Sequence, residues 1–430
     1  MMLHIRDRED FHVDSLSALN TRKTMLVMTA LFFMCGFLAT LNDILIPHLK
    51  ALFELNYAQV MLVQFSFFSS FLIFSYPSGK LVERIGYQRA LVIGLCTMGI
   101  GALLFLPAAA VPSFLMFMFA LVVLAGGVTA LQVSGNPYVS ILGPPRTASS
   151  RLNLTQAFNS LGSTIAPSVG GALILHAAGS PTLEQVHQLT GSALHAYRVQ
   201  QASYVQRPYI GIALTLFVLG FAVARQNFPQ IHSAEGSQSL PGELPSLWNH
   251  RHLILGVAAM FLYCGAEITI GSFLVNYISQ PNIGAMTPRA ASAYVSIYWG
   301  GSMIGRFIGS ALLRVIRTGT LLCFNAIVAV MLVTVSIASH GSLAMWTILL
   351  VGTFNSIMFP SLFTLGIANL GALTGKASGV LMSAAVGAAV IPVLQGAVAD
   401  RIGVHSSFLV PAICYVYVAF YGFKGCHPKR

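Results

Sequence analysis

Charged side chains are scarce in this chain. Lys, Arg, Asp and Glu make up 8% of its 430 residues, and only 12 residues are acidic. Soluble globular proteins carry about 25% charged residues, whereas 56% of the residues here are hydrophobic. The low charge excludes an ordinary soluble protein, and the sequence predicts an all-α protein that crosses a membrane many times.

Cysteine is also rare, and its pattern excludes several kinds of site. The six cysteines are scattered, most of them within apolar runs, and none belongs to a Cys-x-x-Cys pair. The sequence contains no metal-ligand spacing, phosphate-binding loop, dinucleotide-binding loop or nucleophile elbow. We therefore expect no cofactor, no metal and no enzyme active site.

Apolar runs long enough to cross a bilayer recur along the chain. A helical span needs about 20 mostly apolar residues. Twelve spans are predicted, at 24–47, 58–79, 87–109, 112–140, 149–177, 205–227, 251–279, 289–312, 318–338, 342–368, 374–397 and 405–424. The polar stretch before the first span has no evident cleavage site, so we expect no removable signal peptide.

The distribution of basic residues predicts the orientation of the spans. With twelve spans, both termini and the even-numbered loops lie on one side, and most of the 23 Lys and Arg residues fall there. The positive-inside rule places that side in the cytoplasm. The net charge of +11 is thus explained by topology, and we expect the lipid bilayer as a partner and not nucleic acid.

The chain divides at its most polar interior stretch. We expect a cytoplasmic N-terminal segment, two six-helix domains joined by a cytoplasmic linker, and a short cytoplasmic tail. Their predicted boundaries are 1–23, 24–227, 228–250, 251–424 and 425–430.

The two predicted domains repeat each other weakly. Cys35-Gly36 aligns with Cys264-Gly265, the segment 151–167 aligns with 376–392, and Pro137 aligns with Pro360, at offsets of 223 to 229 residues. The second alignment brings Gly162 onto Gly387. Duplicated six-helix halves with a substrate site between them are a recurrent transporter plan.

Two acidic residues lie inside predicted spans. Asp43 stands in "LNDILIP", toward the outer end of the first span, and Glu267 stands near the middle of the seventh. A charge in the membrane costs about 2.5 kcal/mol or more, so such a residue usually faces a cavity or has a partner. Each acid is either a group that loads and releases a proton or a neutral acid that holds helices together. The two do not align in the repeat, which favours separate tasks.

Amide side chains gather on the first, fourth, fifth, seventh and tenth spans. Amides donate and accept hydrogen bonds, as sugar hydroxyls do, although they also join helices to one another. Tyr298 offers either a ring face for a sugar or a packing group. The candidate substrate contacts are Asn42, Gln132, Gln156, Asn159, Glu267, Asn276, Tyr298 and Asn355.

Three further residues are candidates for gating. Arg306 is the one cation well inside a predicted span, where it forms an ion pair between domains or extends to the membrane interface. Glu83 and Arg84 lie in "GKLVERIGYQR", between the second and third spans. Their charges can latch neighbouring helix ends.

Two sets of motifs resemble known families. "GKLVERIGYQR" resembles the loop motif of the major facilitator superfamily, with Glu83 in the position of its Asp. "LNDILIP", "GNPYVSILGP", "RLNLTQAFNSLG" and "FPSLFTLGIANLG" together resemble the fucose–proton symporter family of that superfamily. The resemblance implies twelve transmembrane helices in two pseudo-symmetric domains, alternating access, and uptake of a hexose driven by a proton.

One departure from that family narrows the prediction. Fucose permeases carry an acid at the position of Gln132 and an amide at that of Glu267, and here the two are exchanged. This pattern is similar to the glucose/galactose branch, which includes N-acetylglucosamine permeases. Asp43 matches the family's first-span acid.

We therefore expect a glucose/galactose-type hexose symporter in a bacterial inner membrane, functional as a monomer. Asp43 and Glu267 are the expected proton-coupling residues. The alternatives are an N-acetylglucosamine or fucose symporter, an exporter, a carrier coupled to sodium, and a membrane sugar sensor that transports nothing.

Overall fold

The computed structural model of the chain describes residues 21–40, 57–110, 113–170, 191–226, 228 and 247–427. Asn42, Asp43 and most of the predicted linker lie outside these residues. The described α-helices are Thr21–Thr40, α2 (Tyr57–Ile85), α3 (Tyr87–Ala110), α4 (Phe114–Ile141), α5 (Ala148–Gly170), α7 (Gly191–Arg225), α8 (Arg251–Ile278), α9 (Pro288–Leu312), α10 (Thr318–Ala338), α11 (Gly341–Asn355), α12 (Met358–Gly366), α13 (Thr374–Ser383), α14 (Gly387–Ile402), α15 (Val404–Ser407) and α16 (Leu409–Phe420).

Every predicted span overlaps a helix or a pair of consecutive helices. The tenth span consists of α11 and α12, the eleventh of α13 and α14, and the twelfth of α15 and α16. Within the described residues, nine segments are long and apolar enough to cross a membrane. The other three predicted spans correspond to α2, α5 and α9. Helix α7 begins at Gly191, earlier than the predicted start of the sixth span at residue 205.

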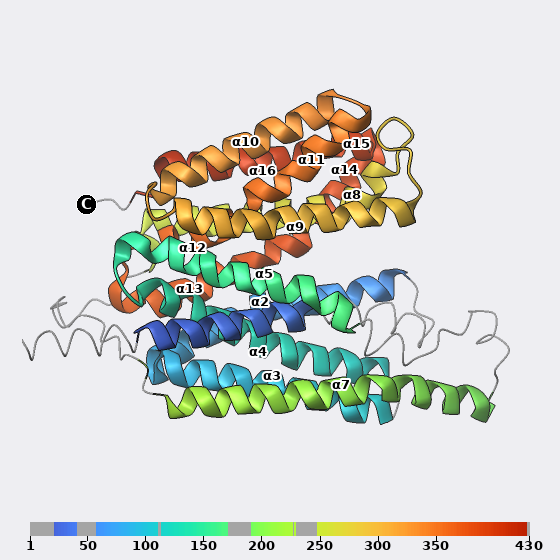
Figure 1. Ribbon diagram of the computed structural model, residues 1–430, viewed down its shortest axis with the longest axis vertical. Helices are drawn as coiled ribbons and strands as arrows, with labels where there is room; N and C mark the ends of the chain where they lie inside the picture. The colour runs from blue at the N-terminus through green and yellow to red at the C-terminus, as the bar shows by residue number, and fades with distance from the viewer. Residues whose placement is uncertain are drawn as a thin grey trace, which may run out of the picture.

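The helices form two bundles (Figure 1). Helices α3, α4 and α7 lie on one side, and α10, α11 and α16 lie on the other. Helices α2, α5 and α9 lie between them. Packing across the middle joins α2 to α13 and α5 to α9.

Polar contacts close the bundle at the end where Thr21, the α4–α5 turn and His427 lie, here called the terminal end. The contacts that join the halves there include Lys376 Nζ to Glu83 Oε2 at 3.1 Å, Ser149 Oγ to Thr364 Oγ1 at 2.6 Å, and Ser150 Oγ to the Ser310 carbonyl at 2.6 Å. The serine and threonine bonds are buried. The two halves therefore meet tightly at this end.

The opposite end differs along helix α9. Met303, Arg306 and Ser310 of α9 contact α5. Away from the terminal end, the same helical face carries Ser292, Ser296 and Trp299, and these three side chains are exposed. Among the described residues, the face of α9 that contacts α5 near the terminal end thus carries exposed side chains toward the other end.

Glycines allow two matching helix crossings, one in each half. A Cβ on Gly162 of α5 would overlap the carbonyl of Phe33 in the first helix. A Cβ on Gly387 of α14 would likewise overlap the carbonyl of Phe261 in α8. Gly162 and Gly387 are repeat partners, so the duplication preserves a backbone-to-backbone crossing that only glycine fits.

Gly162→Ala and Gly387→Ala are expected to destabilise the protein, because the added methyl group forces the crossing helices apart. Overpacking of this kind costs about 1–3 kcal/mol. Gly300→Ala is the matched control, since a Cβ there meets nothing within 4 Å. Thermal unfolding in detergent should show a lower midpoint for the first two variants than for the control. Equal midpoints in all three would contradict the crossing argument.

Candidate functional site

Three amides of the first half bond to one another, and two of them, Asn136 and Gln156, are buried. Asn136 lies one helical turn after Gln132 on α4, so both point the same way. Asn136 Nδ2 donates to Gln132 Oε1 at 3.2 Å, and Gln156 Nε2 from α5 donates to Asn136 Oδ1 at 3.1 Å. The sequence predicts Gln132 and Gln156 as substrate contacts, whereas Asn136 belongs to the same polar cluster of the fourth span but is not among those candidates. The i, i+4 spacing of Gln132 and Asn136 is the signal that identifies it.

Two prolines release backbone carbonyls that side chains then occupy. Proline has no N–H, so the carbonyl four residues earlier loses its helical partner. Pro137 frees the Val133 carbonyl, which accepts a 2.7 Å hydrogen bond from Ser378 Oγ of α13. Pro360 frees the Ser356 carbonyl, at the break between α11 and α12, and this carbonyl accepts a 3.2 Å bond from Arg306 Nε.

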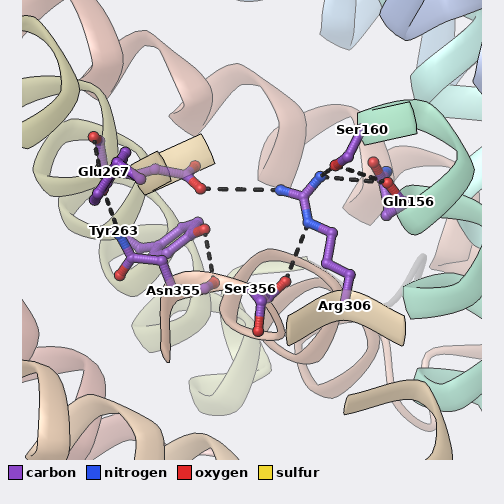
Figure 2. A network of polar contacts seen from close by, with 8 residues as sticks. Gln156, Ser160, Tyr263, Glu267, Arg306, Asn355 and Ser356 are labelled. Carbon is purple, nitrogen blue, oxygen red and sulfur yellow. Dashed lines mark hydrogen bonds and ion pairs between the residues drawn. The ribbon is translucent and has the colours of Figure 1, made fainter. Parts of the chain in front are cut away.

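Arg306 lies at the centre of the polar contacts between the halves (Figure 2). Its Nη1 donates to the Gln156 carbonyl at 3.3 Å and to Ser160 Oγ, both on α5. Its own carbonyl accepts a 2.6 Å bond from Asn153 Nδ2. The side chain is 12% exposed. The guanidinium is thus held by both halves in the interior of the bundle.

Glu267 projects from α8 toward this guanidinium. Its Oε1 lies 3.9 Å from Arg306 Nη2, and its side chain is also 12% exposed. The separation permits attraction but exceeds hydrogen-bond length. Among the described residues, Oε1 has no hydrogen-bond donor. A buried carboxylate oxygen without a donor can take up a proton or accept a hydrogen bond from a ligand hydroxyl.

A fully buried network supports Glu267 within the second half. Asn355 Nδ2 donates to the Tyr298 hydroxyl at 2.7 Å, and that hydroxyl donates to the Glu267 carbonyl at 3.3 Å. The Tyr263 hydroxyl donates to the Asn355 carbonyl at 3.1 Å. Tyr298 is 0% exposed, so its ring is not presented to a ligand in this conformation, whereas the neighbouring Trp299 is 37% exposed.

The remaining candidates have separate locations. Asn159 Nδ2 donates to the Phe32 carbonyl at 2.9 Å and so ties α5 to the first helix. Asn276 is exposed on α8, about two and a half turns from Glu267 and therefore on the opposite side of the helix. Glu83 pairs with Lys376, and Arg84 is exposed. Asn42 and Asp43 are not among the described residues.

The structure adds Ser160, Tyr263 and Ser356 to the site that the sequence predicted. Ser160 lies four residues after Gln156, and Ser356 lies four residues before Pro360, so spacing identifies both. Within the described residues there is no group of three or more His, Cys, Asp or Glu side chains that could hold a metal. The chemistry available is hydrogen bonding to a polar ligand and proton exchange at a carboxyl group.

The sequence is similar to those of known proteins. The sequence matches the Major Facilitator Superfamily over residues 27–385. It is 47% identical over 425 residues to a glucose/galactose transporter of Brucella abortus biovar 1, covering 99% of both chains. It is 30% identical to the L-fucose-proton symporter of Escherichia coli K12, covering 91% of this chain and 90% of that one.

The fold is also similar to that of a solved structure. A Major Facilitator Superfamily transporter, FucP, in its outward conformation superposes with a TM-score of 0.87 and 29% identity, over 94% of this chain and 99% of that one. The described helices thus occupy the positions of a known transporter fold.

Ser378→Ala is expected to loosen α13, because it leaves the buried Val133 carbonyl without a donor. Such a loss costs about 1–3 kcal/mol, or about five- to 150-fold in a local opening equilibrium. Hydrogen–deuterium exchange of residues 374–383 measures it. Ser383→Ala is the control, since its hydroxyl bonds only to Val380 of its own helix among the described residues. Similar exchange in the two variants would show that Ser378 does not hold the halves together.

Proposed function

Because the chain belongs to the Major Facilitator Superfamily, we propose that it takes up a glucose/galactose-type monosaccharide together with a proton, by alternating access between its two halves. The twelve-helix fold expected from the sequence is confirmed by this membership. The superfamily consists of transporters, so the prediction that the chain is not an enzyme is confirmed as well.

One observation carries the choice of substrate class: 47% identity to a glucose/galactose transporter across 99% of both chains. The lower identity to a fucose symporter, 30%, agrees with the exchange of acid and amide between Gln132 and Glu267. The amides of α4 and α5 and the free oxygen of Glu267 supply donors and acceptors suited to sugar hydroxyls.

The terminal end is proposed to face the cytoplasm of a bacterial inner membrane, as the basic residues predict. In that orientation the contacts of Ser149 and Ser150 join the halves at the inward end, and the described side chains of this α9 face are exposed toward the outward end. Its similarity to FucP in the outward conformation supports this assignment. In the proposed cycle the two halves move relative to each other, and the protein functions as a monomer.

Proton coupling is assigned to Asp43 and Glu267. A carrier that concentrates a neutral sugar must couple it to a charged species, and a carboxyl group that is exposed first to one side and then to the other can do so. Glu267 sits beside Arg306 at the junction of the halves. Asp43 stands in the outer part of the first predicted span.

Asp43→Asn is expected to abolish sugar accumulation driven by a pH gradient in membrane vesicles, because the amide cannot release a proton. Sugar-for-sugar exchange, which needs no net proton movement, should continue. Accumulation at the wild-type level would assign Asp43 a structural role. Glu267→Gln is measured in parallel: lost binding indicates a sugar contact, whereas retained exchange without accumulation indicates a proton site.

Gln156→Ala is expected to weaken hexose binding several-fold, because a hydrogen bond to a neutral hydroxyl contributes about 0.5–1.5 kcal/mol. Asn159→Ala should have a similar effect if Asn159 contacts sugar. Isothermal titration with glucose, galactose, N-acetylglucosamine and fucose measures both the loss and the preferred substrate. Unchanged affinity in both variants would reassign the two amides to helix packing.

A further inference from the structure

Arg306 forms hydrogen bonds with some of its neighbours but not with Glu267. It donates hydrogen bonds to the Gln156 carbonyl and Ser160 Oγ on α5, and to the Ser356 carbonyl. Its distance to Glu267 Oε1, 3.9 Å, is too long for a hydrogen bond. To reach full contact with the carboxylate, the guanidinium would have to move away from α5.

We propose that Arg306 is a positioning residue that transmits the charge of Glu267 to the contact between the halves. An ionised Glu267 draws the guanidinium toward α8 and weakens its bonds to α5. A protonated Glu267 exerts no such pull, so Arg306 remains on α5 and the α5–α9 contact stays closed. This inference rests on the proposed proton symport, but Arg306 itself need not touch the transported proton.

The arrangement meets a requirement of any proton symporter. A protonated carrier without sugar must not open inward, because it would leak protons. In that state the acceptors of Arg306 are groups on α5 and the Ser356 carbonyl, so the α5–α9 contact stays closed. A sugar hydroxyl that accepts a hydrogen bond from the guanidinium replaces α5 and releases the contact.

The surroundings of Glu267 leave few other sources of a pH response. Among the described residues, the titratable side chains that interact with it are Tyr263 and Cys264 on α8, Tyr298 and Arg306 on α9, and Tyr415 on α16. Phenols and thiols are ordinarily neutral, and guanidinium is ordinarily charged, between about pH 5 and pH 7. A change of charge within this cluster is therefore assigned, as part of the proposal, to Glu267.

The distance between the terminal ends of the two halves tests the proposal. Arg146, in the α4–α5 turn, and Arg314, after α9, are both exposed and belong to opposite halves. Arg146→Cys and Arg314→Cys, in a chain whose six native cysteines are replaced, provide two spin-label sites for double electron–electron resonance. Without sugar, the ratio of short to long distances should rise about tenfold from about pH 8 to about pH 5, as expected for a charge-assisted bond.

Three variants in this background separate the roles of the two charges. Arg306→Gln should remove the pH response. Glu267→Gln should hold the short distance at both pH values, because its side chain is always neutral. Arg306→Lys should retain part of the response, since lysine keeps the charge but lacks the forked geometry.

Ser160→Ala tests the α5 side of the proposal without touching either charge. It should lower the short-distance fraction at both pH values, because Arg306 loses an acceptor on α5. Thr155→Ala is the control, since its hydroxyl bonds to Leu152 of its own helix. An effect of equal size in the control would contradict the proposed bond.

A pH response that persists in Arg306→Gln, or in Glu267→Gln, overturns the proposal. If Arg306→Gln does not fold, Arg306→Lys and Glu267→Gln decide, because a full wild-type response in either has the same meaning. The proposed function fails by a different result, namely no proton-driven hexose accumulation by the unlabelled wild-type protein. The distance measurement uses no sugar, so the two failures are distinguishable.

Discussion

A guanidinium inside an apolar bundle must find acceptors for its N–H groups within the protein, because lipid offers none. Arg306 finds them on both sides of the junction: the Ser356 carbonyl in its own half, and the Gln156 carbonyl and Ser160 hydroxyl in the other. Glu267 adds an opposite charge at 3.9 Å. Neither half satisfies this cation alone. Any movement that separates α5 from α9 must therefore provide new hydrogen-bond acceptors for Arg306.

Two prolines supply backbone carbonyls that side chains near the junction of the halves use as hydrogen-bond acceptors. Pro360 interrupts the tenth span and frees a carbonyl where Arg306 needs one, while Pro137 frees the carbonyl that Ser378 uses to join α4 to α13. In a membrane, each released carbonyl would otherwise remain unsatisfied at a cost of several kcal/mol. The two prolines are repeat partners, and both place a backbone acceptor close to the junction of the halves. The carbonyl freed by Pro137 is used across that junction, whereas the one freed by Pro360 holds Arg306 within the second half.

The sequence predicts the fold well because the physical signals for it are strong. Hydropathy located every span, and the repeat aligned Gly162 with Gly387, whose common role is a close helix crossing. The candidate site was predicted only in part. Composition identified Gln132, Gln156, Glu267, Arg306 and Asn355, but their connections depend on rotation of the helices about their axes, which hydropathy does not specify. Spacing from Gln156 points to Ser160, but Tyr263 carries a common side chain without a distinctive pattern, so only three-dimensional contact identifies its part in the network.

The two halves have the same plan but distribute their polar groups differently. In the first half, the described network consists of neutral amides that satisfy one another, Gln132, Asn136 and Gln156. In the second half, the corresponding region contains a charge pair, and one carboxylate oxygen has no donor among the described residues. A neutral network suits recognition of hydroxyl groups, because its bonds can be exchanged for bonds to a ligand at little electrostatic cost. The attraction within a charge pair is lost when its carboxylate takes up a proton. The asymmetry of the described residues thus supports the proposal that the amides of α4 and α5 recognise sugar hydroxyls and that Glu267, in addition to Asp43 of the first half, responds to the proton, with Arg306 between them.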